Sequence, residues 1–260
     1  MSVAKFPLES EPPIFLSFPL TRRKTSLQSC FLLHFLSFLL LFSWIYSPYD
    51  QLWKVLDRQV FYFLNQWMQE RTPWSTLWVI ANHRLFDWWT DFIVFSLLTC
   101  SLLNTPKGFR LKKGCFFLSA LLFILLIMMF NNSLFHRLFQ VTRESPSLVL
   151  QPFYSAQELF PNWKVKESSP ISFPSGHGTT LWLAASLFSL GLEKRKAWIL
   201  ILYLSFCSLP RLVVGAHWAS DLLVGSGSIV CLAVAWFRFT PLGEKMTGGF
   251  YLFFCKVMRL

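Results

Sequence analysis

Charged residues are scarce in this 260-residue sequence, and they make up 14% of it, whereas soluble domains carry about 25%. Hydrophobic residues make up 54% and aromatic residues 18%. So much apolar surface excludes an intrinsically disordered chain. The net charge of +11 does not indicate a nucleic-acid partner, because long apolar runs interrupt the basic residues. The composition predicts an integral membrane protein of one domain.

Closely spaced cysteines are also absent. The sequence has no Cys-x-x-Cys pair, and its six cysteines are Cys30, Cys100, Cys115, Cys207, Cys231 and Cys255. This spacing argues against zinc sites and disulfide frameworks. Because an unpaired cysteine in an apolar run behaves as a small hydrophobic residue, we expect all six to be structural.

Apolar runs predict an all-α fold, a polytopic bundle of about six transmembrane helices. The runs are 29–47, 88–103, 115–130, 177–192, 197–209 and 222–239, and the second could begin as early as Leu77. Residues 1–28 then form an N-terminal lead, residues 29–240 the membrane domain and residues 241–260 a C-terminal tail. Residues 49–69 are amphipathic and aromatic-rich, which is typical of a helix lying in the plane of the membrane interface.

The basic residues are distributed unevenly between the two sides of this bundle. With the N-terminus in the cytoplasm, the cytoplasmic side holds 15 of the 24 Lys and Arg residues. The other side then carries 9 basic and 9 acidic residues, so the whole net charge of +11 lies on the cytoplasmic side. The positive-inside rule favours this orientation.

Ionisable residues at membrane depth cost roughly 2.5–3.5 kcal/mol each on insertion scales, so they often mark functional sites. The sequence Phe-Pro-Ser-Gly-His at residues 173–177 opens the fourth run on the side opposite the basic loops. Ser175 is a candidate helix N-cap, and the free N–H groups that follow it would face an anion. His177 would project from the first helical turn.

A second cluster opens the sixth run. Arg211 is followed by His217 and Asp221, which are four residues apart and would share one face of a helix. Asp221 could accept the Nδ1–H of His217 and leave Nε2 as a nucleophile. The planar fork of Arg211 suits phosphate oxygens. The plain alternative is that these are polar helix-end residues satisfied by their neighbours.

Two weaker clusters lie on the same side. The candidate residues are His136, Arg137 and Arg143 after the third run, and Asn82, Arg84 and Asp87 before the second. The first group supplies cationic donors, but it could also be an ordinary loop with snorkelling side chains. The second group could equally be an Arg–Asp pair on an interfacial turn.

The sequence resembles the type 2 phosphatidic acid phosphatase (PAP2) superfamily of membrane lipid phosphatases and phosphotransferases. The family motif Pro-Ser-Gly-His matches in full at residues 174–177, and Ser-Arg-x5-His-x3-Asp matches except that Pro210 replaces Ser. The motif Lys-x6-Arg-Pro is degenerate, because His136 replaces Lys and Glu144 replaces Pro.

Further resemblance points to the subfamily that moves a phosphate from undecaprenyl pyrophosphate to lipid A. It covers residues 60–66, Asn-x-Arg-x2-Asp at 82–87 and Arg-x-Ser-Pro at 143–146. The resemblance implies a multi-pass protein of the bacterial inner membrane with its active site facing the periplasm and with membrane lipids as substrates. Ser175 and Gly176 are present as in ordinary phosphatases, so a phosphatase acting on undecaprenyl pyrophosphate, lipid A or phosphatidate-like lipids remains the alternative.

The resemblance also implies the role of each residue. His217 attacks the terminal phosphoryl group and forms a phosphohistidine, Asp221 orients the ring, and His177 protonates the leaving oxygen. The phosphate-binding residues would be Arg143, Arg211, Ser175 and Gly176, with His136 and Arg137 in the degenerate motif. Asn82, Arg84 and Asp87 would contact substrate. Because the sequence has no carboxylate cluster and arginines supply the positive charge, we expect neither a metal nor a cofactor.

Overall fold

The computed structural model of the protein describes residues 26–46, 48–131 and 142–258, and every structural statement below concerns these residues. They form helices joined by loops, with no strand. The prediction of an all-α membrane helix bundle is therefore confirmed. His136 and Arg137 lie outside the described residues.

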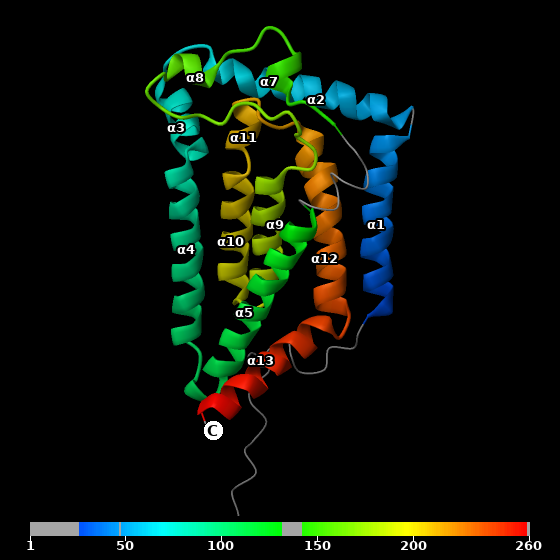
Figure 1. Ribbon diagram of the computed structural model, residues 1–260, viewed down its shortest axis with the longest axis vertical. Helices are drawn as coiled ribbons and strands as arrows, with labels where there is room; N and C mark the ends of the chain where they lie inside the picture. Colours follow the sequence, from blue (N-terminus) through cyan, green and yellow to red (C-terminus); the bar gives the residue numbers. More distant parts are fainter. Residues whose placement is uncertain (1–25, 47, 132–141, 259–260) are drawn as a thin grey trace, which may run out of the picture.

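The long helices stand side by side and run along the length of the molecule (Figure 1). They are α1 (Leu27–Ile45), α4 (Arg84–Leu103), α5 (Lys107–Phe130), α9 (Gly176–Ser189), α10 (Lys194–Cys207) and α12 (Gly227–Phe239). Each of the six predicted runs contributes one of these helices.

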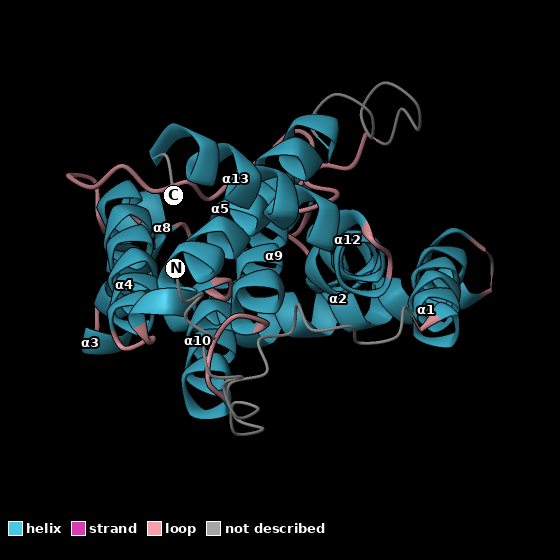
Figure 2. Cartoon of the chain, turned by 90° about the horizontal axis from the view of Figure 1, so that it is seen from below, coloured by secondary structure: helices cyan, strands magenta, loops and turns pink. Residues whose placement is uncertain are grey.

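Five described segments are long and apolar enough to cross a membrane, and together they include α1, α4, α5, α10 and α12. Helix α9 has only 14 residues. It packs against α5, α10 and α12 (Figure 2), so its neighbours shield it on several sides.

The second predicted run does not continue back to Leu77 as one helix. Instead, α3 (Pro73–Asn82) ends at His83, whose backbone is extended, and α4 begins at Arg84. The Nδ1 atom of His83 accepts a hydrogen bond from the backbone N–H of Leu85 and caps the new helix.

A polar layer covers one end of the bundle (Figure 1). It contains α2 (Tyr49–Asn65), the 3-10 helix η2 (Gln66–Met68), and the short helices α7 (Pro146–Val149) and α8 (Ala156–Leu159). Helix α2 crosses the bundle end, as the amphipathic stretch predicts, and buries Asp57, Phe61 and Asn65. The Asn65 side chain accepts from the Tyr154 N–H and donates to the Val213 carbonyl, so it ties α2 to the layer and to the bundle.

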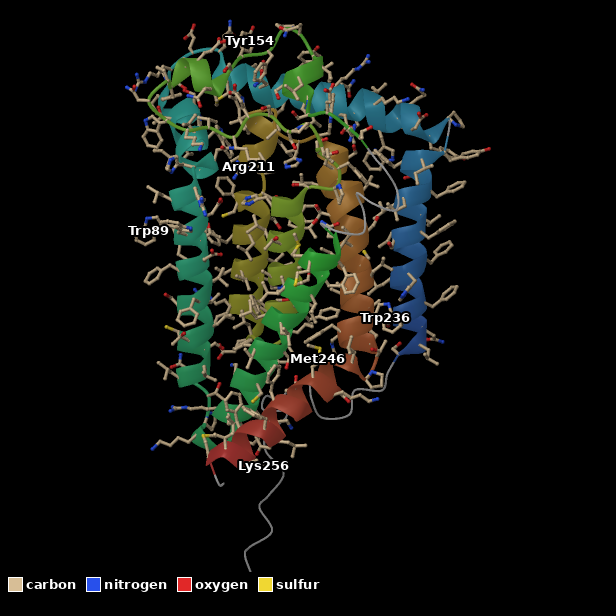
Figure 3. The ribbon with its side chains drawn as sticks, viewed as in Figure 1. Trp89, Tyr154, Arg211, Trp236, Met246 and Lys256 are labelled. Atoms are coloured by element: carbon tan, nitrogen blue, oxygen red, sulfur yellow. The ribbon has the colours of Figure 1, made fainter. Side chains whose placement is uncertain are left out.

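The basic segments assigned to the cytoplasm lie at the opposite end. Helices α5 and α10 begin there, and α13 (Leu242–Met258) crosses it (Figure 1). Figure 3 shows Lys256 of α13 at that end and Arg211 near the polar layer. Helix α13 occupies the stretch expected to be a C-terminal tail and packs on α5 and α12.

The apolar core fills the space between α5, α9, α10 and α12. Its large buried members include Phe116, Phe123, Ile124, Leu183, Leu187, Phe188, Leu200, Leu204 and Phe237. Helices α1 and α4 instead expose many large apolar side chains, which suits a surface in contact with lipid chains. All six cysteines are free, and Cys115 and Cys207 are fully buried.

The segment that follows Asp221 touches the Pro-Ser-Gly-His segment at Gly225, in the π-helix η4 (Asp221–Ser226) that leads into α12. A Cβ atom at Gly225 would lie 2.7 Å from Cβ and 3.0 Å from Cα of Pro174, the residue before Ser175. Only a residue without a side chain allows this approach of the two backbones.

Replacing Gly225 by Ala should therefore lower the thermal unfolding midpoint of the detergent-solubilised protein, because overpacking costs about 1–3 kcal/mol. The matched control is Gly248→Ala on α13, where an added Cβ would meet no atom within 4 Å. Equal midpoints for the two variants would contradict the close contact at Gly225.

Candidate active site

Three segments that are distant in the sequence meet beneath α2. They are residues 143–147, residues 172–178 and the stretch from α11 (Pro210–Val213) through η4. The backbones of the first two pair directly, because the Ser172 N–H donates to the Arg143 carbonyl and the Ser145 N–H to the Ser169 carbonyl. Figure 3 places Arg211 at this end of the bundle, below the polar layer.

His217 is held in one tautomer by a backbone carbonyl. Its Nδ1 atom lies 2.9 Å from the carbonyl oxygen of Ser172. Because a carbonyl oxygen can only accept, Nδ1 must carry the proton. The Nε2 atom of the neutral ring then keeps its lone pair, which is the form that a nucleophile needs.

Asp221 lies next to His217, but the reason differs from the prediction. His217 occupies a bend before the helix, so the expectation that both residues share a helical face is wrong. The Asp221 carboxylate accepts from the Trp218 N–H at 2.8 Å, and this cap folds the chain back. Its Oδ2 atom lies 3.5 Å from Nδ1 of His217, farther than the Ser172 carbonyl oxygen.

Arg143 braces this arrangement between two buried carboxylates. Its Nη1 donates to Oδ1 of Asp221 at 2.6 Å and to the Ser220 hydroxyl at 2.8 Å, and its Nη2 donates to Oδ2 of Asp57 at 2.6 Å. Asp57 also accepts from the backbone N–H and the hydroxyl of Ser220. The exposed fractions of the Asp57 and Asp221 side chains are 1% and 0%.

The guanidinium of Arg143 also lies over the rings of Trp44 and Trp218, with centroids at 5.6 and 4.8 Å. Three of its five N–H donors are used within the described part of the chain, which leaves two for a phosphate. The first task of Arg143 in this structure is therefore to fix Asp221, and phosphate binding can use only the remaining donors.

The second predicted motif begins α9. The Ser175 side chain accepts from the Gly178 N–H at 3.2 Å, which confirms the predicted N-cap. Ser175 is fully buried, and its own N–H donates to the Asp221 carbonyl. The first N–H groups of α9, beginning with Gly176, have no partner within the helix and suit an anion.

His177 projects from the first turn of α9 and is partly exposed. Its Nε2 lies 3.3 Å from the carbonyl oxygen of Cys207, so Nε2 carries a proton. Its Nδ1 lies 3.9 Å from Oδ1 of Asp87. The Asp87 carboxylate would favour a second proton on Nδ1, whereas burial and the positive charge of Arg211 oppose it.

Arg211 is nearly buried and is held by two of the predicted substrate contacts. Its Nη1 donates to Oδ1 of Asn82 at 3.2 Å, and its Nη2 lies 3.5 Å from Oδ2 of Asp87. Asn82 is itself buried, so its contacts within the protein indicate a positioning role. Arg84 is exposed, with its guanidinium over the Trp88 ring.

Sequence reasoning missed three residues that build the site: Asp57, Ser172 and Ser220. The signal for Asp57 was present, because Asp57, Phe61 and Asn65 recur every four residues on α2 and form its buried stripe. A carboxylate in such a stripe requires a buried partner. Ser172 acts through its carbonyl, which the identity of a side chain cannot reveal.

The described residues contain no group of three or more His, Cys, Asp or Glu side chains that could hold a metal ion. The arrangement instead combines a histidine with a free Nε2, a second histidine beside a carboxylate, a helix N-terminus and two arginines. This combination suits the transfer of a phosphoryl group through a histidine.

Comparisons with known proteins agree with this chemistry. Residues 117–245 match the PAP2 superfamily. The chain is 28% identical to lipid A 1-diphosphate synthase of Escherichia coli (strain K12) over 219 residues, which cover 83% of this chain and 89% of that protein. It is 40% identical to lipid A 1-phosphatase of Porphyromonas gingivalis over 58 residues, 21% of this chain and 13% of that protein. No solved structure matches the chain.

Replacing Asp57 by Ala should lower both the stability and the turnover of the protein. The variant leaves Arg143 with one carboxylate partner and removes the acceptor of the Ser220 N–H and hydroxyl. Removing one partner of a buried ion pair costs about 3–5 kcal/mol. The matched control is Asp50→Ala on the same helix, which removes a first-turn carboxylate and its pair with the exposed Lys54, a pair worth about 0–1 kcal/mol. Thermal unfolding and activity should separate the two variants, and similar losses in both would contradict the bracing role.

Proposed function

Residues 117–245 belong to the PAP2 superfamily, a family of enzymes, and from this premise we propose that the protein transfers the terminal phosphate of undecaprenyl pyrophosphate to lipid A through a phosphohistidine. The similarity to lipid A 1-diphosphate synthase supports the choice of acceptor. The geometry around His217 supports the covalent step.

The observation that carries the proposal is the contact of His217 with the Ser172 carbonyl. It keeps the proton on Nδ1 and leaves the lone pair of Nε2 free to attack phosphorus. In the first step, the Nε2–P bond forms and the bond from phosphorus to the bridging oxygen breaks. Undecaprenyl phosphate leaves with the bonding electrons, and a proton from His177 neutralises its oxygen.

In the second step, His177 takes a proton back from the 1-phosphate of lipid A, and the freed oxygen attacks the phosphorus of phosphohistidine. The Nε2–P bond breaks, the ring returns to its neutral form, and lipid A 1-diphosphate leaves. No other reactant is needed, because the energy of the pyrophosphate bond is retained in the product. A transfer that needs no further energy source suits the periplasm, where ATP is absent.

Charge at the site favours the phosphohistidine. Arg143 neutralises only one of the two carboxylates that it contacts, Asp57 and Asp221. The two carboxylates share the remaining negative charge, and Oδ2 of Asp221 lies 3.5 Å from Nδ1 of His217, where it would stabilise the positive ring formed when Nε2 is phosphorylated. Arg211, the N–H groups at the start of α9 and the remaining donors of Arg143 would hold the phosphoryl oxygens.

The proposed location is the bacterial inner membrane, with the active site facing the periplasm. The site lies at the end covered by α2, whereas the basic starts of α5 and α10 lie at the other end. The positive-inside rule assigns that basic end to the cytoplasm. A lipid pyrophosphate is then an accessible phosphate donor at the site.

A second candidate function is hydrolysis, with water in place of lipid A in the second step. The similarity to lipid A 1-phosphatase over 58 residues favours it, as does the intact Pro-Ser-Gly-His motif at residues 174–177. Both functions share the first step, so they differ only in what takes the phosphate from His217.

The two functions are separated by purified protein, undecaprenyl pyrophosphate labelled in its terminal phosphate, and lipid A. Transfer predicts label in lipid A, whereas hydrolysis alone predicts label in free phosphate. Rapid quenching without an acceptor should also trap phosphoprotein that is acid-labile and base-stable. His217→Ala should abolish this species, and its persistence in the variant would show that His217 is not the nucleophile.

His177→Ala in the same assay should keep the phosphoprotein but slow its formation, because the variant lacks only the proton donor. General acid catalysis contributes about 10²–10⁴-fold. A loss as complete as that of His217→Ala would contradict the division of roles between the two histidines.

The proposed orientation has its own test. A cysteine at Glu158, in the exposed polar layer, should react with a membrane-impermeant thiol reagent in intact spheroplasts. A cysteine at Lys194, where α10 begins, should react only after the membrane is opened. The reverse pattern would place the active site in the cytoplasm.

A further inference from the structure

A polar cavity of about 650 Å³ lies beside Arg211. Its walls are the turn between α3 and α4 and the extended segment of residues 164–168. The charged side chains in these walls are Arg84, Asp87, Lys164, Lys166, Glu167 and Arg211. Neither lysine belongs to any of the motifs on which the sequence-based site rests.

The cavity carries an excess of positive charge. Arg211 faces Asp87 at 3.5 Å, but Arg84, Lys164 and Lys166 have no carboxylate within 4.0 Å among the residues that the structure describes. Glu167, whose carboxylate accepts from the Ser155 hydroxyl and the Gln157 N–H, offsets only one of these three charges. Three unpaired cations around one cavity indicate an anionic ligand.

The cavity is connected to the candidate active site by two side chains. Oδ1 of Asn82 accepts from both the Lys166 N–H, at 3.1 Å, and Nη1 of Arg211, at 3.2 Å. Asp87 faces Arg211 with one carboxylate oxygen and Nδ1 of His177 with the other. A ligand in the cavity would therefore lie against Arg211 and against Asp87, the carboxylate that faces His177.

We propose that this cavity binds the phosphosugar headgroup of the acceptor, with Lys164 and Lys166 contacting its phosphate. The inference rests on the proposed transfer reaction and specifies its acceptor site. In a double displacement, the acceptor oxygen approaches phosphorus from the side that the leaving oxygen vacated, which is the side of His177. The acceptor must therefore approach on the side of His177, and the Asp87 carboxylate that faces His177 also lines this cavity.

The size of the cavity favours a glycosyl phosphate over a phosphate alone. A volume of about 650 Å³ lies within the range of roughly 300–1,000 Å³ that is usual for sites that hold whole small molecules. Trp88, which also lines the cavity, adds an apolar ring against which a sugar can pack. Undecaprenyl phosphate has no sugar, so it would fill only the end next to Arg211.

The test is the double variant Lys164→Ala/Lys166→Ala. The matched control is Lys54→Ala/Arg58→Ala, which removes two exposed cations from α2, outside the cavity. In the transfer assay, the KM for lipid A should rise about tenfold or more in the test variant, because two charge-assisted contacts are lost. The KM for undecaprenyl pyrophosphate should change less. Equal changes in both KM values, or a test variant that matches the control, would overturn the proposal.

A binding measurement separates this proposal from the proposed reaction. His217→Ala protein cannot form phosphohistidine, so its Kd for lipid A reports binding alone. Adding Lys164→Ala and Lys166→Ala to this protein should raise its Kd about tenfold for lipid A that carries a 1-phosphate. The Kd for lipid A without a 1-phosphate should rise much less. If the wild-type protein transfers no phosphate, the proposed reaction is wrong. The Kd of the His217→Ala protein still tests whether the cavity binds lipid A. An unchanged Kd would overturn the cavity proposal even if transfer occurs.

Discussion

The site depends on one buried ion network, in which Arg143 joins Asp57 of α2 to Asp221 beside His217. A carboxylate without a partner at this depth would lose its charge or destabilise the fold. The guanidinium therefore holds three segments of the chain in one arrangement. Because Asp57 also accepts two hydrogen bonds from Ser220, movement of α2 away from the bundle would expose the whole network.

This network connects the membrane surface to the chemistry. Helix α2 crosses the end of the bundle, with its buried stripe on the site and its other faces exposed. The long helices lie below it, and His217 is nearly buried beneath the polar layer. In the proposed reaction, a lipid phosphate would enter from the interface while the reacting atoms remain largely shielded from water, which would strengthen every electrostatic contact.

Much of the architecture could be predicted because it follows local rules. Apolar runs give the helices, and the residue types at 174–177 give the N-cap at Ser175. The sequence predicted that His217 and Asp221 lie together, but it did not predict the backbone conformation that makes them neighbours. A capping turn, and not a shared helical face, brings them together. The spacing of Asp57, Phe61 and Asn65 signals a buried carboxylate on α2, but the partners of Asp57 are 86 and 163 residues away, and no periodicity identifies them. The cavity at Lys164 likewise arises only when distant loops meet.

The central claim is that one histidine carries the phosphoryl group between two lipids. The most direct test is the stereochemical course at phosphorus, followed with undecaprenyl pyrophosphate whose terminal phosphate is chiral by isotopic labelling. Each in-line displacement inverts the configuration, so transfer to lipid A through phosphohistidine predicts overall retention. Overall inversion would mean that lipid A attacks the donor directly, and it would contradict the covalent role of His217.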